Sequence, residues 1–294
     1  MDNILVYVRA ESDKSPFPIQ PKQGISWRWL HDGVTLEERY EIPIEKNVFQ
    51  NLRNKCHDME IDVFLTSSVH RRKKLLLADM DATIIEGETL DELADFIGLK
   101  NEIATITSSA MLGEIDFKTA LEKRVSLLKD LPISSLEKTL LKTKINAGAK
   151  DVVRVMRHFG AKCYLVSGGF TYFTEAIAKE CGFSGHHGNK FDIQAGSLTG
   201  KVKPPILDKD TKLNLLNHYA QNLGLTLDET MAVGDGANDI PMLMGAGLGV
   251  GFYPKPAVRE KIINYIIHTD LTSLLYIQGY SWQDIASSRQ DFQS

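Results

Sequence analysis

The sequence predicts an α/β protein with a doubly wound parallel sheet and a helical module inserted into it. From residue 75 onward, short apolar runs alternate with amphipathic helical stretches, and polar or glycine-rich segments bound each run. Strands that are apolar along their whole length suit burial on both faces, as in parallel sheets covered by helices. The alternation also favours right-handed crossover connections. The expected core strands are residues 75–78, 163–166, 231–233, 248–252 and 265–268, and the expected core helices are 151–159, 172–181, 210–223 and 239–244.

Residues 1–70 predict a smaller α/β appendage that carries no recognisable chemical motif. Its expected strands are 4–8, 40–44 and 61–65, and its expected helix is 48–56. Three prolines, at positions 16, 18 and 21, interrupt regular structure after the first strand. A basic run, HRRKK at residues 70–74, leads into the rest of the chain. Runs of charge usually face solvent, so we expect a solvated linker or the entrance to the first core strand.

Two insertions interrupt the alternation of strand and helix. Residues 88–148 contain no strand-like run but several amphipathic stretches, such as 90–97 and 117–128, which predicts a small helical module directly after the first core strand. Residues 188–202 alternate and turn at Ala195-Gly196, as an antiparallel hairpin does. The expected division is therefore an appendage at 1–70, a core at 71–87 and 149–294, and an inserted helical module at 88–148.

Composition excludes several classes of partner. The chain of 294 residues has 34 Lys and Arg against 38 Asp and Glu, a net charge of −4, so it lacks a general basic field for nucleic acid. Its first ten residues lack the basic start of a signal peptide, and its apolar stretches are shorter than the roughly 20 residues that span a bilayer. Three widely spaced cysteines fit inert thiols in a reducing compartment. We expect a cytoplasmic monomer or homodimer without membrane or nucleic-acid partners.

Acidic side chains follow two of the expected core strands. Asp79 and Asp81 come directly after residues 75–78, and Asp235 and Asp239 lie in the glycine-rich segment after residues 231–233. Ligands bind outside the carboxyl ends of the strands in open α/β sheets, so these carboxylates are expected to converge. Neighbouring carboxylates repel each other, so either a cation keeps both ionised or one of them holds a proton. Oxygen ligands of this kind suit Mg²⁺.

A second group of residues predicts a phosphate site at the same edge. Ser167 and Gly168 end the expected strand 163–166, and a hydroxyl followed by glycines lets main-chain N–H groups approach a phosphate closely. Lys212 lies early in the expected helix 210–223, where its ammonium can reach a phosphoryl group. Taken singly, each motif also fits a turn, a helix cap, a calcium loop or an exposed lysine. Their joint occurrence in this order favours a site for an anion and a divalent metal.

These motifs resemble the haloacid dehalogenase-like superfamily, over about residue 72 to the end of the chain. Its signature is Asp-x-Asp-x-Thr after a strand, a strand ending in Ser or Thr, a helix Lys, and Gly-Asp-Gly-x-Asn-Asp. The helical insertion stands where that superfamily carries its type 1 cap. Within the superfamily, EGETLDELA from Glu88, Phe117-x-x-x-Leu-x-x-Arg124-Val, the segment 231–243 and HTDLTSLLY from His268 are similar to bacterial phosphoserine phosphatases.

The resemblance implies Mg²⁺-dependent hydrolysis of O-phospho-L-serine, the last step of serine biosynthesis. In the implied mechanism, Asp79 is the nucleophile. Asp81 starts protonated, gives its proton to the leaving serine oxygen and then acts as a base on water. The implied metal ligands are the Asp79 and Asp235 carboxylates and the Asp81 main-chain carbonyl, with Asp239 orienting them. The implied phosphate-binding groups are Ser167, Gly168, Lys212 and Asn238.

The cap residues carry the implied substrate choice. Arg124 pairs with the α-carboxylate and Glu88 with the α-ammonium, while Met111 and Phe117 exclude water. Without the resemblance, these four residues fit surface helix charges and the core of the cap better than a substrate site. One departure is Ala82, where the family usually has Ser; it removes a hydroxyl near the phosphate site, and we expect altered rather than abolished activity. Two alternatives remain: a phosphatase for another small phosphate monoester, and a non-enzymatic phospho-ligand sensor or phospho-accepting receiver.

Overall fold

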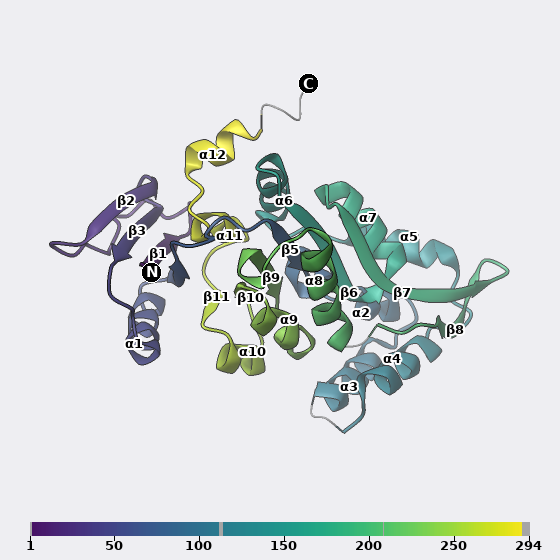
Figure 1. The fold of residues 1–294 in the computed structure, drawn as a ribbon. Coiled ribbons are helices and arrows are strands. Elements are labelled where there is room, and N and C mark those ends of the chain that lie inside the picture. The colour runs from purple at the N-terminus through teal and green to yellow at the C-terminus, as the bar shows by residue number, and fades with distance from the viewer. Residues whose placement is uncertain (1, 112–113, 208, 290–294) are drawn as a thin grey trace.

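The computed structural model describes residues 2–111, 114–207 and 209–289, and it confirms the doubly wound α/β fold. A seven-stranded sheet has the order β11-β10-β9-β5-β6-β7-β8, and its strands are parallel except for β8 (Figure 1). Its strands are β5 (Leu75–Ala78), β6 (Lys162–Phe170), β7 (Gly185–Gln194), β8 (Ser197–Lys203), β9 (Thr230–Gly234), β10 (Leu248–Phe252) and β11 (Asn264–Ile266). The first core strand along the chain, β5, therefore lies in the middle of the sheet, between β9 and β6.

The predicted strands are confirmed, with differences at their ends. β6 is longer than the expected 163–166, and β11 begins and ends before the expected 265–268. The hairpin expected at 188–202 forms from β7 and β8, with Ala195 and Gly196 both at positive φ in its turn. Its first strand, β7, also pairs in parallel with β6. The alternating pattern of the hairpin did not predict this second pairing.

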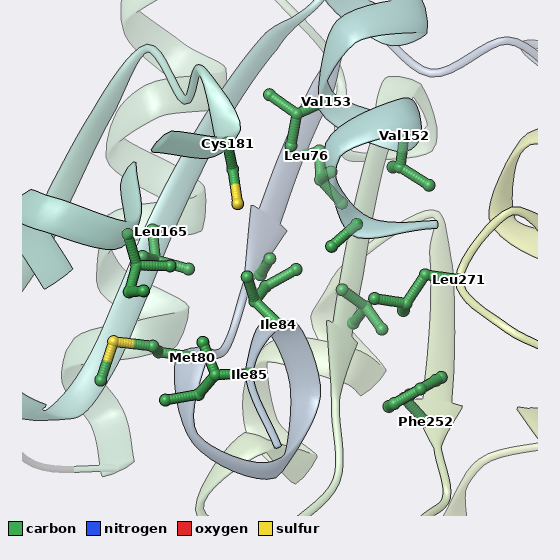
Figure 2. Close-up of a cluster of buried hydrophobic side chains, with 14 of the residues drawn as sticks. Leu76, Met80, Ile84, Ile85, Val152, Val153, Leu165, Cys181, Phe252 and Leu271 are labelled. Carbon is green, nitrogen blue, oxygen red and sulfur yellow. The ribbon is translucent and has the colours of Figure 1, made fainter. Parts of the chain in front are cut away.

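Helices cover both faces of the sheet because consecutive residues of a strand point to opposite sides. Leu75 and Leu77 pack in one cluster with residues of α8, α9 and α10, whereas Leu76 packs in another with residues of α6, α7 and α11. Figure 2 shows the second side, where Leu76 lies beside Val153 of α6. These helices are α6 (Ala149–His158), α7 (Thr171–Cys181), α8 (Lys209–Asn222), α9 (Ile240–Gly245), α10 (Pro256–Lys261) and α11 (Ser273–Ile277). Among the described residues, no helix combines the length and apolarity needed to cross a membrane.

In its described residues, the inserted helical module has four helices between β5 and α6. They are α2 (Thr89–Asp95), α3 (Lys100–Met111), α4 (Phe117–Ser126) and α5 (Ile133–Lys142). The chain leaves and re-enters the core at one point, where Ile85 forms an antiparallel bridge with Ile145. The far end of the module is held by β8, because the main chain of Leu198 hydrogen-bonds Asp130 and Leu131. We call this module the cap.

The appendage is a four-stranded antiparallel sheet with one helix packed on it. Its elements are β1 (Asn3–Arg9), β2 (Ser26–His31), β3 (Thr35–Tyr40), α1 (Lys46–His57) and β4 (Ile61–Ser67), and the strand order is β2-β3-β1-β4. The strand expected at 40–44 is wrong: β3 ends where that stretch begins, and β2 was missed. β3 was not predicted because it contains Glu37 and Glu38, and two adjacent acids rarely lie buried in a strand. Glu38 is accommodated by hydrogen bonds from the hydroxyls of Tyr7 and Tyr40, each 2.9 Å.

The basic run at 70–74 leads into β5, as expected, but only part of it is solvated: three of its five residues are exposed, and the other two contact the rest of the protein. Arg71 lies 2.7 Å from Glu37 of the appendage and donates through Nε to the main-chain oxygen of Ile277, at 3.0 Å. Lys73 is buried and donates to the main-chain oxygen of Asp228, at 2.6 Å. The run therefore joins the appendage to the core. Its two less exposed charged residues, Arg71 and Lys73, are accommodated by contacts with distant segments, which a sequence pattern does not reveal.

We expect Arg71→Met to lower the free energy of unfolding by about 1.5–3 kcal/mol, because Glu37 loses a charged hydrogen-bond partner, although Arg28 still contacts its other oxygen at 2.5 Å. Arg72 is the matched control: it is 45% exposed and contacts Asp284 and the ring of Tyr280. Arg72→Met should cost about 1 kcal/mol or less. Urea denaturation of both variants measures the difference. Equal losses would show that the Arg71 ion pair contributes no more than a surface contact.

The three cysteines are buried and unpaired, as expected. Burial raises the pKa of each thiol, Cys56, Cys163 and Cys181, to about 12. Thiolate is the reactive form, so these residues are protonated and unreactive at neutral pH.

Candidate active site

A cavity of about 430 Å³ lies between the cap and the carboxyl ends of β5, β6 and β9. This is the position at which open α/β sheets bind ligands. Nine of the residues predicted from the sequence line it: Asp79, Asp81, Glu88, Phe117, Arg124, Ser167, Gly168, Asp235 and Asn238. Lys212 and Asp239 are not part of the lining but contact it from behind. The side chain of Met111 lies outside the described part of the chain.

Asp79 is held between a main-chain contact and a buried ammonium. Its N–H donates to the main-chain oxygen of Val233 on β9, at 3.0 Å, which fixes the end of β5. Lys212 Nζ, from the first turn of α8, lies 2.7 Å from Asp79 Oδ1 and 2.5 Å from Asp239 Oδ1. Burial alone would lower the pKa of Lys212, but the two carboxylates raise it, so the ammonium stays charged.

Three buried carboxylates form a cluster that its two lysine partners, Lys212 and Lys255, do not fully neutralise. Oxygens of Asp79, Asp235 and Asp239 all lie within 4.8 Å of one another. Burial raises the pKa of Asp79 well above its usual value, Asp239 and Asp235 raise it further, and Lys212 opposes them. Oxygen-only ligands at such spacing, with excess negative charge, fit a hard divalent cation. Asp239 approaches closely because β9 ends in Gly234, where a Cβ would lie 2.4 Å from Asp239 Cγ.

Asp81 lies in the turn that follows β5, lines the same cavity as Asp79 and accepts three hydrogen bonds. The N–H and hydroxyl of Thr89 donate to its Oδ1, both at 2.9 Å, and the Ser167 hydroxyl donates to its Oδ2 at 3.0 Å. Thr89 begins α2, so Asp81 also links the core to the cap. Ala82, the residue that departs from the family pattern, has φ of 52°, a left-handed conformation that costs a non-glycine residue about 1 kcal/mol.

The end of β6 presents a hydroxyl and main-chain groups to the cavity. The Ser167 hydroxyl also accepts the Gly169 N–H, at 2.7 Å. A Cβ on Gly168 would lie 3.1 Å from the ring of Phe117, so glycine lets the cap pack tightly against this strand end. Asn189 of β7, which the sequence analysis missed, fixes the segment: its Nδ2 donates to the Gly168 oxygen at 2.7 Å and its Oδ1 accepts the Leu207 N–H at 2.8 Å.

Lys255 is a second cation that the sequence analysis missed. Its Nζ lies 3.0 Å from Asp235 Oδ2 and 3.6 Å from Glu88 Oε1, so it stands between the acidic cluster and the cap. Its N–H donates to the Asp235 main-chain oxygen, at 2.9 Å. Lys255 lies shortly after the carboxyl end of β10. Searching for charged residues after that strand, as was done for the strands that precede Asp79 and Asp235, would have found it.

The cap contributes one acid and one cation to the cavity. Burial and the nearby Asp81 raise the pKa of Glu88 to about 7, although Lys255 opposes the shift. The Arg124 guanidinium makes only long hydrogen bonds within the described chain, 3.4 Å to Thr107 Oγ1 and 3.4 Å to the Ala120 oxygen. Burial lowers the pKa of Arg124, while Glu88 and two aspartates raise it. Donors this weakly engaged can bind an anionic group with little competition.

Comparison with known proteins gives a consistent family. The profile of the haloacid dehalogenase-like hydrolases matches residues 76–244. The chain is 39% identical over 229 residues to the phosphoserine phosphatase of Archaeoglobus fulgidus, which covers 77% of this chain and 67% of that protein. It is 42% identical over 205 residues to that of Streptococcus thermophilus, covering 70% of this chain and 95% of that protein. The chain spans 53% of the length of a 37% identical phosphoserine phosphatase from Mycobacterium tuberculosis, with 74% of this chain matched.

Solved structures extend the similarity. A substrate-bound phosphoserine phosphatase complex superimposes with a TM-score of 0.66 at 38% identity, covering 69% of this chain and 97% of that chain. A HAD family hydrolase from Salmonella enterica serovar Typhi has a TM-score of 0.84 at 26% identity, covering 94% of this chain and 98% of that chain. Because the second match covers 94% of this chain, it includes the appendage, so appendage and core occur together in another protein.

Proposed function

The chain belongs to the haloacid dehalogenase-like hydrolase family, and from that premise we propose that it hydrolyses O-phospho-L-serine to L-serine and inorganic phosphate. One observation carries this proposal: a single cavity holds the carboxyl pair Asp79 and Asp81 on the core side and the opposite charges Glu88 and Arg124 on the cap side. The first pair fits transfer of a phosphoryl group. The second fits a zwitterionic amino acid head group. The reaction would be the last step of serine biosynthesis.

The proposed chemistry uses two displacements at phosphorus. The Asp79 carboxylate attacks phosphorus, the bond to the serine oxygen breaks, and Asp81 gives its proton to that oxygen. Asp81, now ionised, takes a proton from water, and the resulting hydroxide attacks the aspartyl phosphate. Phosphate leaves and Asp79 is regenerated. The contacts of Asp81 with Thr89 and Ser167 support this role, because they hold its carboxyl at the side of the phosphate site.

We propose Mg²⁺ as the cation of the acidic cluster. Asp79, Asp235 and the main-chain carbonyl of Asp81 would hold it, with Asp239 orienting the cluster from behind. Bound there, it would neutralise phosphoryl oxygens and keep the Asp79 carboxylate ionised. The raised pKa of Asp79 supports this assignment, because the three carboxylates outnumber the two lysines, Lys212 and Lys255, that contact them.

The remaining predicted residues would form the phosphate and head-group sites. We propose that Ser167, the Gly168 N–H, Lys212 and Asn238 bind phosphoryl oxygens. Glu88 would accept the substrate ammonium, and Arg124 would pair with its carboxylate. Phe117 packs on Gly168 and would keep water out, a role we also propose for Met111. In this proposal residues 88–148 set substrate choice, on a core of 71–87 and 149–294, with the appendage at 1–70.

Arg124→Ala should separate head-group recognition from phosphoryl transfer. We expect kcat/KM for phosphoserine to fall about 10- to 100-fold, because charge-assisted hydrogen bonds to the carboxylate are lost. Hydrolysis of a sugar phosphate, which offers no carboxylate, should change less than about threefold. Steady-state kinetics on a panel of phosphate monoesters, with and without Mg²⁺, measures both effects.

The same panel tests the proposed substrate against the alternative of another small phosphate monoester. A clear preference of the unaltered protein for a sugar phosphate would refute the phosphoserine assignment and leave the phosphatase assignment intact. The receiver alternative lacks support, because the family is one of hydrolases and the cap encloses the acids.

Glu88 should impose a pH dependence on phosphoserine hydrolysis. Its pKa of about 7 means that its carboxyl is protonated below that pH and anionic above it. Only the anion pairs with the substrate ammonium, so kcat/KM should rise as pH increases through about 7. Glu88→Gln should remove that rise and lower kcat/KM at pH 8. The substrate phosphate itself ionises with a pKa of about 6 in both proteins, so the comparison isolates Glu88. Identical pH profiles would contradict this role.

A further inference from the structure

A second cavity, of about 160 Å³, lies where the appendage meets the core. The appendage contributes Arg53 and His57 from α1 and Asp62 from β4, and the core contributes Arg259 from α10 and Tyr265 from β11. We call it the junction pocket. None of its lining residues lines the active-site cavity.

Two guanidinium groups face this pocket without a carboxylate partner in the described part of the chain. Arg53 is fixed by the ring of Tyr265, 4.2 Å from its Cζ, and by donation to the main-chain oxygen of Ile263. Its Nε is nevertheless buried without a hydrogen-bond partner. Arg259 donates through Nε to the Pro254 oxygen at 2.8 Å and is otherwise exposed. Because neither guanidinium is paired with a carboxylate in the described residues, an anion in the pocket would be attracted to both.

The one carboxylate in the lining is already engaged by other groups. Asp62 Oδ1 accepts the Ile267 N–H at 3.0 Å. Its Oδ2 accepts the N–H groups of His268 and Thr269, at 3.1 and 2.9 Å, and the Thr269 hydroxyl at 2.6 Å. Burial raises the pKa of Asp62 and these four hydrogen bonds oppose that shift, so they stabilise its carboxylate. The two arginines still outnumber this single carboxylate among the described lining residues.

From this juxtaposition we propose that the junction pocket binds a small oxyanion, of the phosphate or carboxylate class, between Arg53 of the appendage and Arg259 of the core. Guanidinium groups bind both classes through paired N–H donors. The cavity has the volume of about five waters at roughly 30 Å³ each, which admits such an ion but no nucleotide.

A bound oxyanion would strengthen an existing contact between the two parts. The side chain of Asn264 on β11 already bonds both the N–H and the oxygen of Leu65 on β4, each at 2.9 Å. A ligand that contacts both Arg53 and Arg259 binds only when appendage and core are joined, so it stabilises the joined form. This inference does not depend on which phosphate ester the active site hydrolyses.

Histidine NMR tests the proposal on the full-length protein. His57 lines the pocket and its Nδ1 lies 2.8 Å from His268 Nε2, whereas none of the eight histidines lines the active-site cavity. Inorganic phosphate and acetate are titrated separately at constant pH and at an ionic strength held constant with chloride. We expect a saturable shift of the His57 and His268 ring signals with at least one of the two ions, and the comparison identifies the class.

Charge-removing variants localise the effect. Arg259→Gln, at an exposed position where folding should be preserved, should weaken binding of the active ion at least tenfold, and Arg53→Gln should act similarly. Arg39→Gln, which removes the same charge from an exposed site on β3, should leave binding unchanged. The proposal is overturned if neither ion shifts these signals, if chloride alone produces the same shift, or if the three variants bind alike.

Discussion

Asp79→Asn should lower kcat for phosphoserine by about four orders of magnitude or more while leaving the protein folded. The amide cannot act as the nucleophile, so both displacements are lost. Folding should survive because the substitution removes one of three buried carboxylates, whose pKa is raised by burial and by its acidic neighbours. Asp239 remains as a partner for Lys212, at 2.5 Å. Single-turnover assays and thermal unfolding measure the two effects.

Asp58→Asn is the matched control, since it makes the same chemical change at an exposed position at the end of α1. It should leave kcat unchanged. Retention of full Mg²⁺-dependent activity in Asp79→Asn would contradict the covalent mechanism. Loss of the thermal transition would instead show that Asp79 is needed for folding, and Asp79→Glu, which keeps the charge but displaces the carboxylate, would then be used to test catalysis.

Lys212→Met should have the largest effect on stability. It leaves Asp79 and Asp239 as buried carboxylates without their shared ammonium, and loss of one partner of a buried pair costs about 3–5 kcal/mol. Lowering the pH should reduce this loss, because Asp79 binds a proton more readily than an ordinary Asp. Added Mg²⁺ should also reduce it by supplying positive charge. Activity should fall at least about 100-fold, because a charge at the phosphoryl oxygens is missing.

Urea denaturation in the presence of a chelator, at pH 8 and pH 5.5, measures the stability effect. Lys138→Met, on the exposed surface of α5, provides the control and should change stability by about 0.5 kcal/mol or less. A loss for Lys212→Met that is the same at both pH values would show that uncompensated carboxylates are not its cause.

The core and most of the site could be predicted because their signals are local. Strands buried on both faces require apolar runs, and the catalytic carboxylates stand directly at the ends of those runs, at Asp79 and Asp235. Sheet topology then brings β5 and β9 side by side, so residues 156 positions apart meet in one cluster. Lys212 could be predicted for the same reason, because it lies in the first turn of α8, next to that edge of the sheet.

What the sequence could not predict depends on contacts between distant segments. Asn189 acts by positioning the main chain of Gly168, and a residue that binds main chain leaves no characteristic motif. The buried Glu37 looks like a surface residue until its partner Arg71, 34 positions later, is known to lie beside it. The junction pocket likewise forms only when α1 meets α10, so neither segment suggests it alone.

The most direct test of the mechanism is to trap the phosphorylated enzyme. The protein is mixed with phosphoserine and Mg²⁺, quenched in acid within one turnover, digested and analysed by mass spectrometry. We predict one added phosphoryl group on the peptide that contains Asp79, absent from Asp79→Asn and lost in mild base, as an acyl phosphate is. A burst of serine with no phosphorylated peptide, or a phosphoryl group on a different residue, would contradict Asp79 as the nucleophile.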